Sequence, residues 1–127
     1  MKTIKKISAY LFFGILLTLS SGLHAQDLVK VVPKGFTKVL LENDQVRVLQ
    51  IESAPGESTP LHSHPNYVLY ALTDGKLQVT DKDKPATVLE FKAGDALYFP
   101  AVTHIAKNAG TATAKMVLIE LKTPVKK

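Results

Sequence analysis

The chain has 127 residues, with 16 lysine and arginine residues, 11 aspartate and glutamate residues and a formal net charge of +5. This length is enough for one compact domain. There is no cysteine, which excludes disulfides, a lipid-modified cysteine and thiol catalysis. Because no run of basic residues with interleaved aromatic residues is present, the sequence does not favour nucleic-acid binding.

Residues 1–25 have the layout of a secretory signal peptide. Early lysines are followed by an apolar run over residues 7–19, which is short for a membrane span, and Ala25 is a small residue before the predicted cleavage site. Leu23 departs from the usual small residue three positions before cleavage, so an uncleaved anchor is the alternative. We expect a periplasmic or secreted protein that is free of the membrane once the signal is removed. The leader holds three lysines, so the mature domain is less basic than the whole chain.

Residues 26–37 are predicted to form an N-terminal arm or an edge strand. The segment is apolar at Leu28, Val29, Val31 and Val32, and Pro33 and Gly35 then interrupt it. It either lies over its own domain or reaches to a partner subunit, and either pairing would protect an exposed sheet edge. The sequence leaves both placements open.

Residues 38–122 are predicted to form a single domain of short strands, followed by a C-terminal tail over residues 123–127. Segments rich in β-branched and other apolar residues alternate with turn residues. No segment after the leader has a sustained helical period with capping residues. This pattern indicates an all-β sandwich or barrel.

Turn residues mark the expected strand boundaries. Asn43-Asp44 separates the first two strands, and Asp74-Gly75 predicts a tight hairpin turn within residues 67–80. The polar segment at residues 81–86 and the Ala93-Gly94-Asp95 turn precede later strands. We expect the side chain of Asp95 to stabilise its own turn, and that of Asn108 to do the same at its strand end.

The histidines are the strongest functional signal in the sequence. Apart from one in the leader, the chain has only His62, His64 and His104. Residues i and i+2 of a strand point to the same face, so the His62–His64 pair presents two imidazoles side by side. A third imidazole from a distant strand can complete a set of nitrogen ligands for a divalent metal.

Two groups of residues in this region are spaced as in known motifs. They resemble the two motifs of the cupin superfamily, and the resemblance to small single-domain bacterial cupins covers roughly residues 38–121. The matching residues are Gly56, His62, His64 and Gly75 in the first motif, and Gly94, Pro100, His104 and Asn108 in the second.

The resemblance implies an all-β fold, a small jelly-roll β-barrel of the RmlC-like kind. It also implies that His62, His64 and His104 are the ligands of a divalent transition metal, with iron, zinc, nickel and copper all compatible with imidazole ligands. A small-molecule ligand or substrate and a homodimer are further expectations from the resemblance.

Two residues depart from the motifs. Val68 stands where the first motif has a glutamate, and a valine cannot coordinate a metal. Val102 replaces a glycine before His104, and this turn is one residue short, so the loop must adopt another conformation. With three neutral imidazoles only, a divalent ion favours an anionic ligand at its open position.

Tyr70 is predicted to share the inward face with Val68, near the histidines, and to assist catalysis; a core tyrosine is the alternative. Arg47 is the only arginine, and it is either a clamp for a substrate carboxylate or a surface residue.

The sequence is compatible with three functions. The first is a metal-dependent enzyme, dioxygenase-like or isomerase-like, that acts on a small oxygenated or anionic metabolite. The second is a non-catalytic protein that binds a small ligand, with or without metal. The third is a structural dimerisation domain whose histidines have lost their role.

Overall fold

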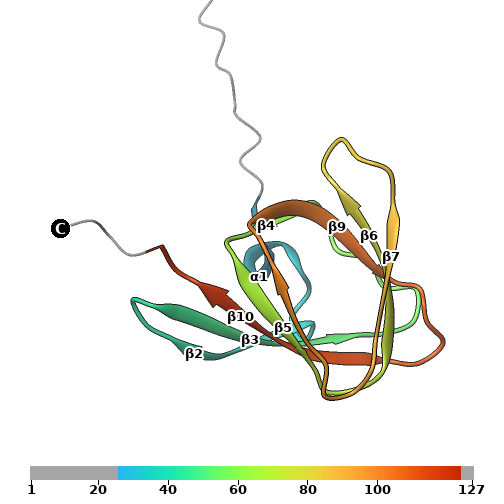
Figure 1. Cartoon of the computed structure of the whole chain (residues 1–127), viewed down its shortest axis with the longest axis horizontal. Helices are drawn as coiled ribbons and strands as arrows, with labels where there is room; N and C mark the ends of the chain where they lie inside the picture. The colour runs from blue at the N-terminus through green and yellow to red at the C-terminus, as the bar shows by residue number, and fades with distance from the viewer. Residues whose placement is uncertain (1–25, 124–127) are drawn as a thin grey trace, which may run out of the picture.

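The chain folds into two five-stranded sheets that face each other, as the computed structural model shows (Figure 1). The structure describes residues 26–123. The predicted signal peptide (residues 1–25) and all but the first residue of the predicted tail (residues 123–127) lie outside the described residues. The predicted all-β jelly-roll fold is confirmed.

The first sheet, which carries the histidines, has the strand order β1-β4-β9-β6-β7. Its strands are β1 (Gln26–Asp27), β4 (His62–His64), β9 (Val102–Asn108), β6 (Gly75–Asp81) and β7 (Thr87–Phe91). The second sheet has the order β2-β3-β10-β5-β8. Its strands are β2 (Thr37–Glu42), β3 (Val46–Ser53), β10 (Ala114–Leu121), β5 (Tyr67–Ala71) and β8 (Ala96–Phe99).

Several predicted turns are stabilised by the side chains that the sequence singles out. The Oδ1 atom of Asn43 accepts hydrogen bonds from two backbone N–H groups of the β2–β3 turn. Asp95 accepts from the backbone N–H of Lys92 at 2.8 Å, which closes the turn around Gly94. Asn108, which is buried, donates to the carbonyl groups of Ser53 and Ala112 and so holds the end of β9.

The predicted hairpin around Asp74-Gly75 is wrong. β5 pairs with β10 and β8 in the second sheet, whereas β6 pairs with β7 and β9 in the first sheet. The chain therefore crosses between sheets at this turn. The same turn residues suit both connections, because a local turn signal does not specify the strand with which each arm pairs.

Packing explains the glycine at position 75 better than turn geometry does. Gly75 lies opposite Phe91 in the β6–β7 pair, and its φ angle is not among the positive values. A Cβ atom at this position would overlap the ring of Phe91, which is only 3% exposed. Glycine here lets the buried ring lie directly on the neighbouring strand.

The N-terminal arm lies on its own chain. β1 pairs in parallel with β4, and a single helical turn, α1 (Leu28–Val31), follows it. Leu28 is 1% exposed and joins the core between the sheets. Of the two placements that the sequence leaves open, the structure shows the intramolecular one.

The core is formed by the inward faces of both sheets. Every second residue of β5, of β10 and of β3 from Leu49 onward is buried, as expected for strands with one covered face. Within the described part of the chain, no helix is long and apolar enough to cross a membrane. The buried apolar residues are Leu28, Phe36, Leu49, Ile51, Tyr67, Leu69, Ala71, Leu77, Phe91, Ala114, Met116 and Leu118.

We expect Gly75→Ala to lower the free energy of unfolding by about 1–3 kcal/mol, because overpacking in a filled core has this cost. Urea unfolding followed by circular dichroism measures the loss. In a Phe91→Leu background the ring is gone, so the additional loss caused by Gly75→Ala should become small. An equal loss in both backgrounds would contradict the overlap with Phe91.

Candidate metal centre

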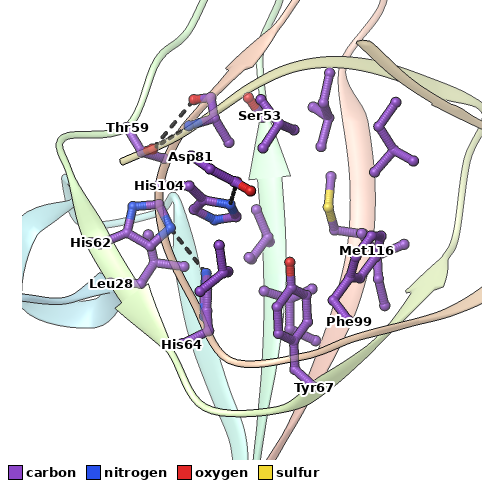
Figure 2. A pocket seen from close by; sticks show the side chains of 18 of the residues that line it. Leu28, Ser53, Thr59, His62, His64, Tyr67, Asp81, Phe99, His104 and Met116 are labelled. Carbon is purple, nitrogen blue, oxygen red and sulfur yellow. Dashed lines mark hydrogen bonds and ion pairs between the residues drawn. The ribbon is translucent and has the colours of Figure 1, made fainter. Parts of the chain in front are cut away.

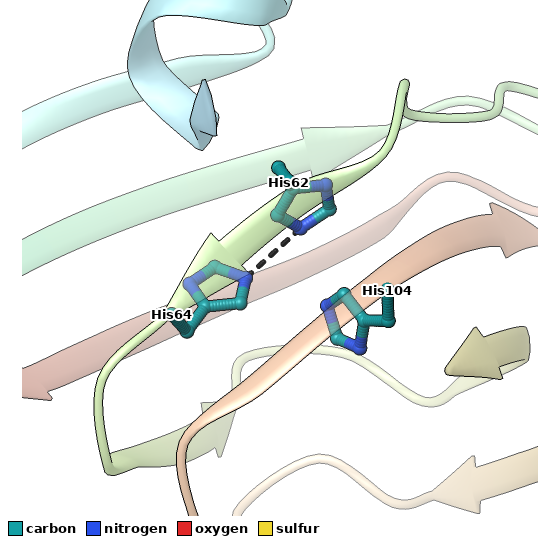
Figure 3. Close-up of side chains that lie close together, drawn as sticks. All are labelled: His62, His64 and His104. Atoms are coloured by element: carbon teal, nitrogen blue, oxygen red, sulfur yellow. Dashed lines mark hydrogen bonds between the residues drawn. The ribbon is translucent and has the colours of Figure 1, made fainter. Parts of the chain in front are cut away.

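The three histidines come from two adjacent strands of the first sheet. β4 carries His62 and His64, and β9 carries His104 directly opposite His62 in the antiparallel pair. Because i and i+2 share a face and cross-strand partners share a face, this register turns all three side chains into the barrel. Figure 3 shows the rings gathered on the inner side of the two strands.

The three rings form a tight, buried cluster. Their centroids are 4.7 Å apart for His62 and His64, 4.8 Å for His62 and His104, and 5.2 Å for His64 and His104. One potential ligand atom from each ring lies within 4.8 Å of the others, and each residue is at most 6% exposed. The structure therefore brings together the three residues that the sequence assigns to a metal site.

Hydrogen bonds fix the tautomers of two of these rings. The Nδ1 atom of His62 lies 2.8 Å from the carbonyl oxygen of Pro60, which can only accept, so this nitrogen is the donor. The Nδ1 atom of His64 lies 2.7 Å from a carboxylate oxygen of Glu120 and is likewise the donor. In the neutral form of either ring, the lone pair then belongs to Nε2.

The two Nε2 atoms face each other at 3.0 Å. A hydrogen bond between them requires that one ring carry a second proton. In His62, burial opposes a second proton and lowers the pKa to about 4. Burial also lowers the pKa of His104 to about 3, with a further contribution from the two neighbouring imidazoles. His62 therefore keeps the lone pair of its Nε2 atom, which faces the ring of His64.

His64 is connected to three further charged residues. The second carboxylate oxygen of Glu120 accepts from Nε of Arg47 at 2.7 Å, and the same guanidinium contacts both carboxylate oxygens of Asp27 at 2.6 and 2.9 Å. Burial alone would raise the pKa of Glu120, but the hydrogen bonds from His64 and Arg47 outweigh it and hold this pKa below its ordinary value. Glu120 is therefore a carboxylate in the folded protein.

Neither sequence-based role for Arg47 agrees with its position. Its side chain is 14% exposed and clamps two carboxylates of its own chain, so it is not a surface residue. The hydrogen bond from Arg47 lowers the pKa of Asp27, and the reciprocal hydrogen bond raises the pKa of Arg47. Arg47 therefore binds carboxylates of its own chain, and not the substrate carboxylate that the sequence suggests.

The predicted inward placement of Tyr70 is wrong. Tyr70 is 43% exposed on the outer side of β5, and Val68 is not among the residues that line the cavity. The inward residues of this strand are Tyr67, Leu69 and Ala71. Motif spacing assigns Val68 to the glutamate position, but it does not fix which face of the strand that residue takes.

Tyr67 occupies the place predicted for Tyr70. Its ring is 4.8 Å from that of His64 and stacks on Phe99 at 5.2 Å. Figure 2 shows its hydroxyl directed into the cavity beside the histidines. Burial raises the pKa of this hydroxyl, so it stays protonated and can donate a hydrogen bond to a ligand.

His104 has an acidic neighbour as well. Asp81, the last residue of β6, is its cross-strand partner, and the His104 Nδ1 atom lies 3.9 Å from an Asp81 carboxylate oxygen. The shortened turn before His104 does not misdirect this ring. Val102 becomes the first residue of β9, and Asp83 is the only described non-glycine residue with a positive φ angle.

The histidines lie at one end of a cavity of about 370 Å³ between the sheets (Figure 2). This size is within the range of small-molecule sites. Apolar side chains from both sheets form most of its wall, and Asp81 and Lys84 are the charged residues in it. The apolar wall includes Leu28, Phe36, Ile51, Leu69, Leu77, Val79, Leu89, Phe99, Met116 and Leu118.

Sequence reasoning missed Glu120, Tyr67 and Asp81. A signal for Glu120 exists, because it continues an inward series whose other members, such as Met116 and Leu118, are apolar. A carboxylate in that series requires a buried partner. Asp81 has no comparable signal, since it stands at the start of a polar turn.

Comparison with protein families gives a direct result. The family model described as "Cupin domain" matches residues 49–120. The chain belongs to the cupin family. A comparison with the curated proteins finds no match.

Solved cupin structures resemble this one. A cupin domain from Bordetella pertussis Tohama I is 26% identical with a TM-score of 0.64, covering 68% of this chain and 92% of that chain. A cupin-like protein from Thermotoga maritima is 28% identical with a TM-score of 0.51, covering 66% and 65%. An RmlC-like cupin family protein from Methanocaldococcus jannaschii is 19% identical with a TM-score of 0.57, covering 68% and 78%, and shows the fold alone.

Proposed function

We propose that this cupin is a metal-dependent enzyme, dioxygenase-like or isomerase-like, for a small oxygenated, anionic metabolite. His62, His64 and His104 would hold a divalent transition metal, with iron, zinc, nickel and copper as the candidates. The observation that carries the proposal is the buried cluster of three imidazoles, in which the Nε2 atoms of His62 and His64 lie 3.0 Å apart.

The donor set suits a metal ion. The potential ligand atoms of the three rings all lie within 4.8 Å of one another, and imidazole nitrogen is a common ligand of divalent transition metals. Burial disfavours a second proton on His62 and on His104, so each of these rings keeps a lone pair that a cation could use.

The charge of the site favours an anionic ligand. Histidine ligands bind a metal as neutral imidazoles, and the motif carboxylate is replaced by Val68. A divalent metal in such a site acts as a Lewis acid toward an oxygen atom of a bound anion. The apolar wall of the cavity would enclose the carbon skeleton of that anion and exclude water from it.

Two side chains near the histidines give the site groups that can act on a bound molecule. The Tyr67 hydroxyl points into the cavity and would donate a hydrogen bond to a ligand oxygen. Asp81 lines the same cavity with its side chain 38% exposed, and its carboxylate can accept a proton from a ligand or solvent. We place this function in the periplasm or outside the cell, on the basis of residues 1–25.

We expect the protein, purified without a histidine tag, to contain about one transition-metal ion per chain by elemental analysis. His62→Ala and His104→Ala should lose this metal, because each removes one of three ligands. Tyr70→Phe is the matched control and should keep it, since Tyr70 lies on the outer surface. Circular dichroism shows that each variant is folded.

Wild-type protein that takes up no metal after reconstitution would contradict the proposed centre. Enzymatic turnover is tested separately, by measuring oxygen consumption and product formation with small carboxylates and diketones as candidate substrates. A metal-loaded protein that binds these compounds and converts none of them is a binding protein, and the enzymatic part of the proposal is then wrong.

We expect Tyr67→Phe to weaken binding of a carboxylate from this panel by about 2- to 10-fold, which corresponds to one lost hydrogen bond. Equilibrium titration of the metal-loaded protein measures the dissociation constant. Tyr70→Phe removes a hydroxyl from the outer face of the same strand and should have no effect. Equal effects of both substitutions would contradict the assignment of Tyr67 to the site.

A further inference from the structure

We propose that Glu120, Arg47 and Asp27 form a positioning relay for the metal centre, so that docking of the N-terminal arm helps to orient His64. The relay runs from the His64 ring to Glu120, from Glu120 to Arg47 and from Arg47 to Asp27 in the arm. The inference rests on the proposed metal-binding function, which it deepens.

The contacts of the relay are short, and most of it is buried. His64 donates to one oxygen of Glu120 at 2.7 Å, and Arg47 reaches the other oxygen through Nε at 2.7 Å and through Nη2 at 2.6 Å. The side chains of His64 and Glu120 are each 2% exposed, that of Arg47 is 14% exposed, and that of Asp27 is 31% exposed. Both oxygens of Glu120 are thus used, and its orientation is determined from two sides.

The first contact of the relay selects the tautomer of His64. A carboxylate that accepts from Nδ1–H leaves Nε2 with its lone pair in the cluster. Carboxylates in this position behind a ligand histidine fix the ring and make it a better donor. Arg47 in turn holds the carboxylate, because a guanidinium presents its N–H groups in a rigid, planar arrangement.

The last contact brings the arm into the relay. Asp27 accepts from Nη1 and Nη2 of Arg47, and its Oδ1 atom also accepts from the backbone N–H of Val29 at 3.0 Å. The same two-residue strand pairs with β4, with Gln26 opposite His62 and Asp27 opposite Ser63. The arm therefore contacts the strand that carries two of the ligands and, through Arg47, the residue behind one of them.

The charges of the relay suit a cation in the histidine cluster. Two carboxylates and one guanidinium leave one net negative charge next to His64. This charge compensates in part for the motif carboxylate that Val68 cannot supply. Exposed ion pairs of the same protein, such as Lys115 with Glu52 at 3.7 Å, contact no histidine of the cluster. They are expected to contribute little to the binding of a cation there.

The test measures the affinity of Co²⁺ for the full protein by competition with a chromophoric chelator. Glu120→Gln keeps the size of the side chain and removes its charge, and we expect an affinity about 10- to 100-fold lower. Asp27→Asn acts only through Arg47 and should lower the affinity by a few-fold. Glu52→Gln is the matched control, because it neutralises an exposed glutamate on β3, and should leave the affinity unchanged.

The double variant Asp27→Asn/Glu120→Gln distinguishes a relay from independent effects. If Asp27 acts through Glu120, its substitution should have no further effect once Glu120 is replaced. Additive losses, or a folded Glu120→Gln protein that binds Co²⁺ like the wild type, would overturn the relay. Should Glu120→Gln not fold, Arg47→Lys takes its place: a few-fold loss supports the relay and an unchanged affinity overturns it.

A spectroscopic readout without metal tests the same step. Nitrogen-15 spectra of the histidine side chains should show the Nδ1–H tautomer for both His62 and His64 in the wild type. In Glu120→Gln the signal of His64 should shift toward a mixture of tautomers, whereas His62, held by the Pro60 carbonyl, should keep its Nδ1–H tautomer. An unchanged His64 spectrum contradicts the relay. A wild-type protein that binds no Co²⁺ contradicts the proposed function instead, and the spectra separate the two failures.

Discussion

The antiparallel pairing of β4 with β9 is the constraint on which the site depends. Only three residues of β4 take part, yet their register places His62 opposite His104 and puts His64 on the same inner face. A shift of this register by one residue would turn the histidines of one strand away from those of the other. The neighbouring strand β6 and the arm hold this short pair from both sides.

Burial gives the cluster its chemical character. In water, imidazole nitrogens form hydrogen bonds with solvent. In this cavity the Nδ1 atoms of His62 and His64 already have a protein acceptor. Burial also penalises a second proton on His62 and on His104. The fold thus places potential ligand atoms of the three histidines within 4.8 Å of one another, where they could hold a metal ion.

Much of the fold and the identity of the three histidines could be predicted from the sequence, because strand periodicity, turn residues and motif spacing are local. Strand pairing is not local, so the turn residues at Gly75 predict a hairpin although the turn connects two sheets. Spacing also failed to distinguish Tyr67 from Tyr70, since a shift of one residue exchanges the faces of a strand. The link between Glu120 and Arg47 joins β3 to β10 across the sheet, and only the tertiary register brings them together.

The solitary arginine gives the protein an internal reporter. Arg47 is the only arginine in the chain, and its guanidinium is covered by the carboxylate of the arm. A dicarbonyl reagent selective for guanidinium groups consequently has a single target, which is shielded while the arm is in place. The rate at which the Arg47 guanidinium is labelled would report how often the N-terminal segment leaves the barrel, without any engineered probe.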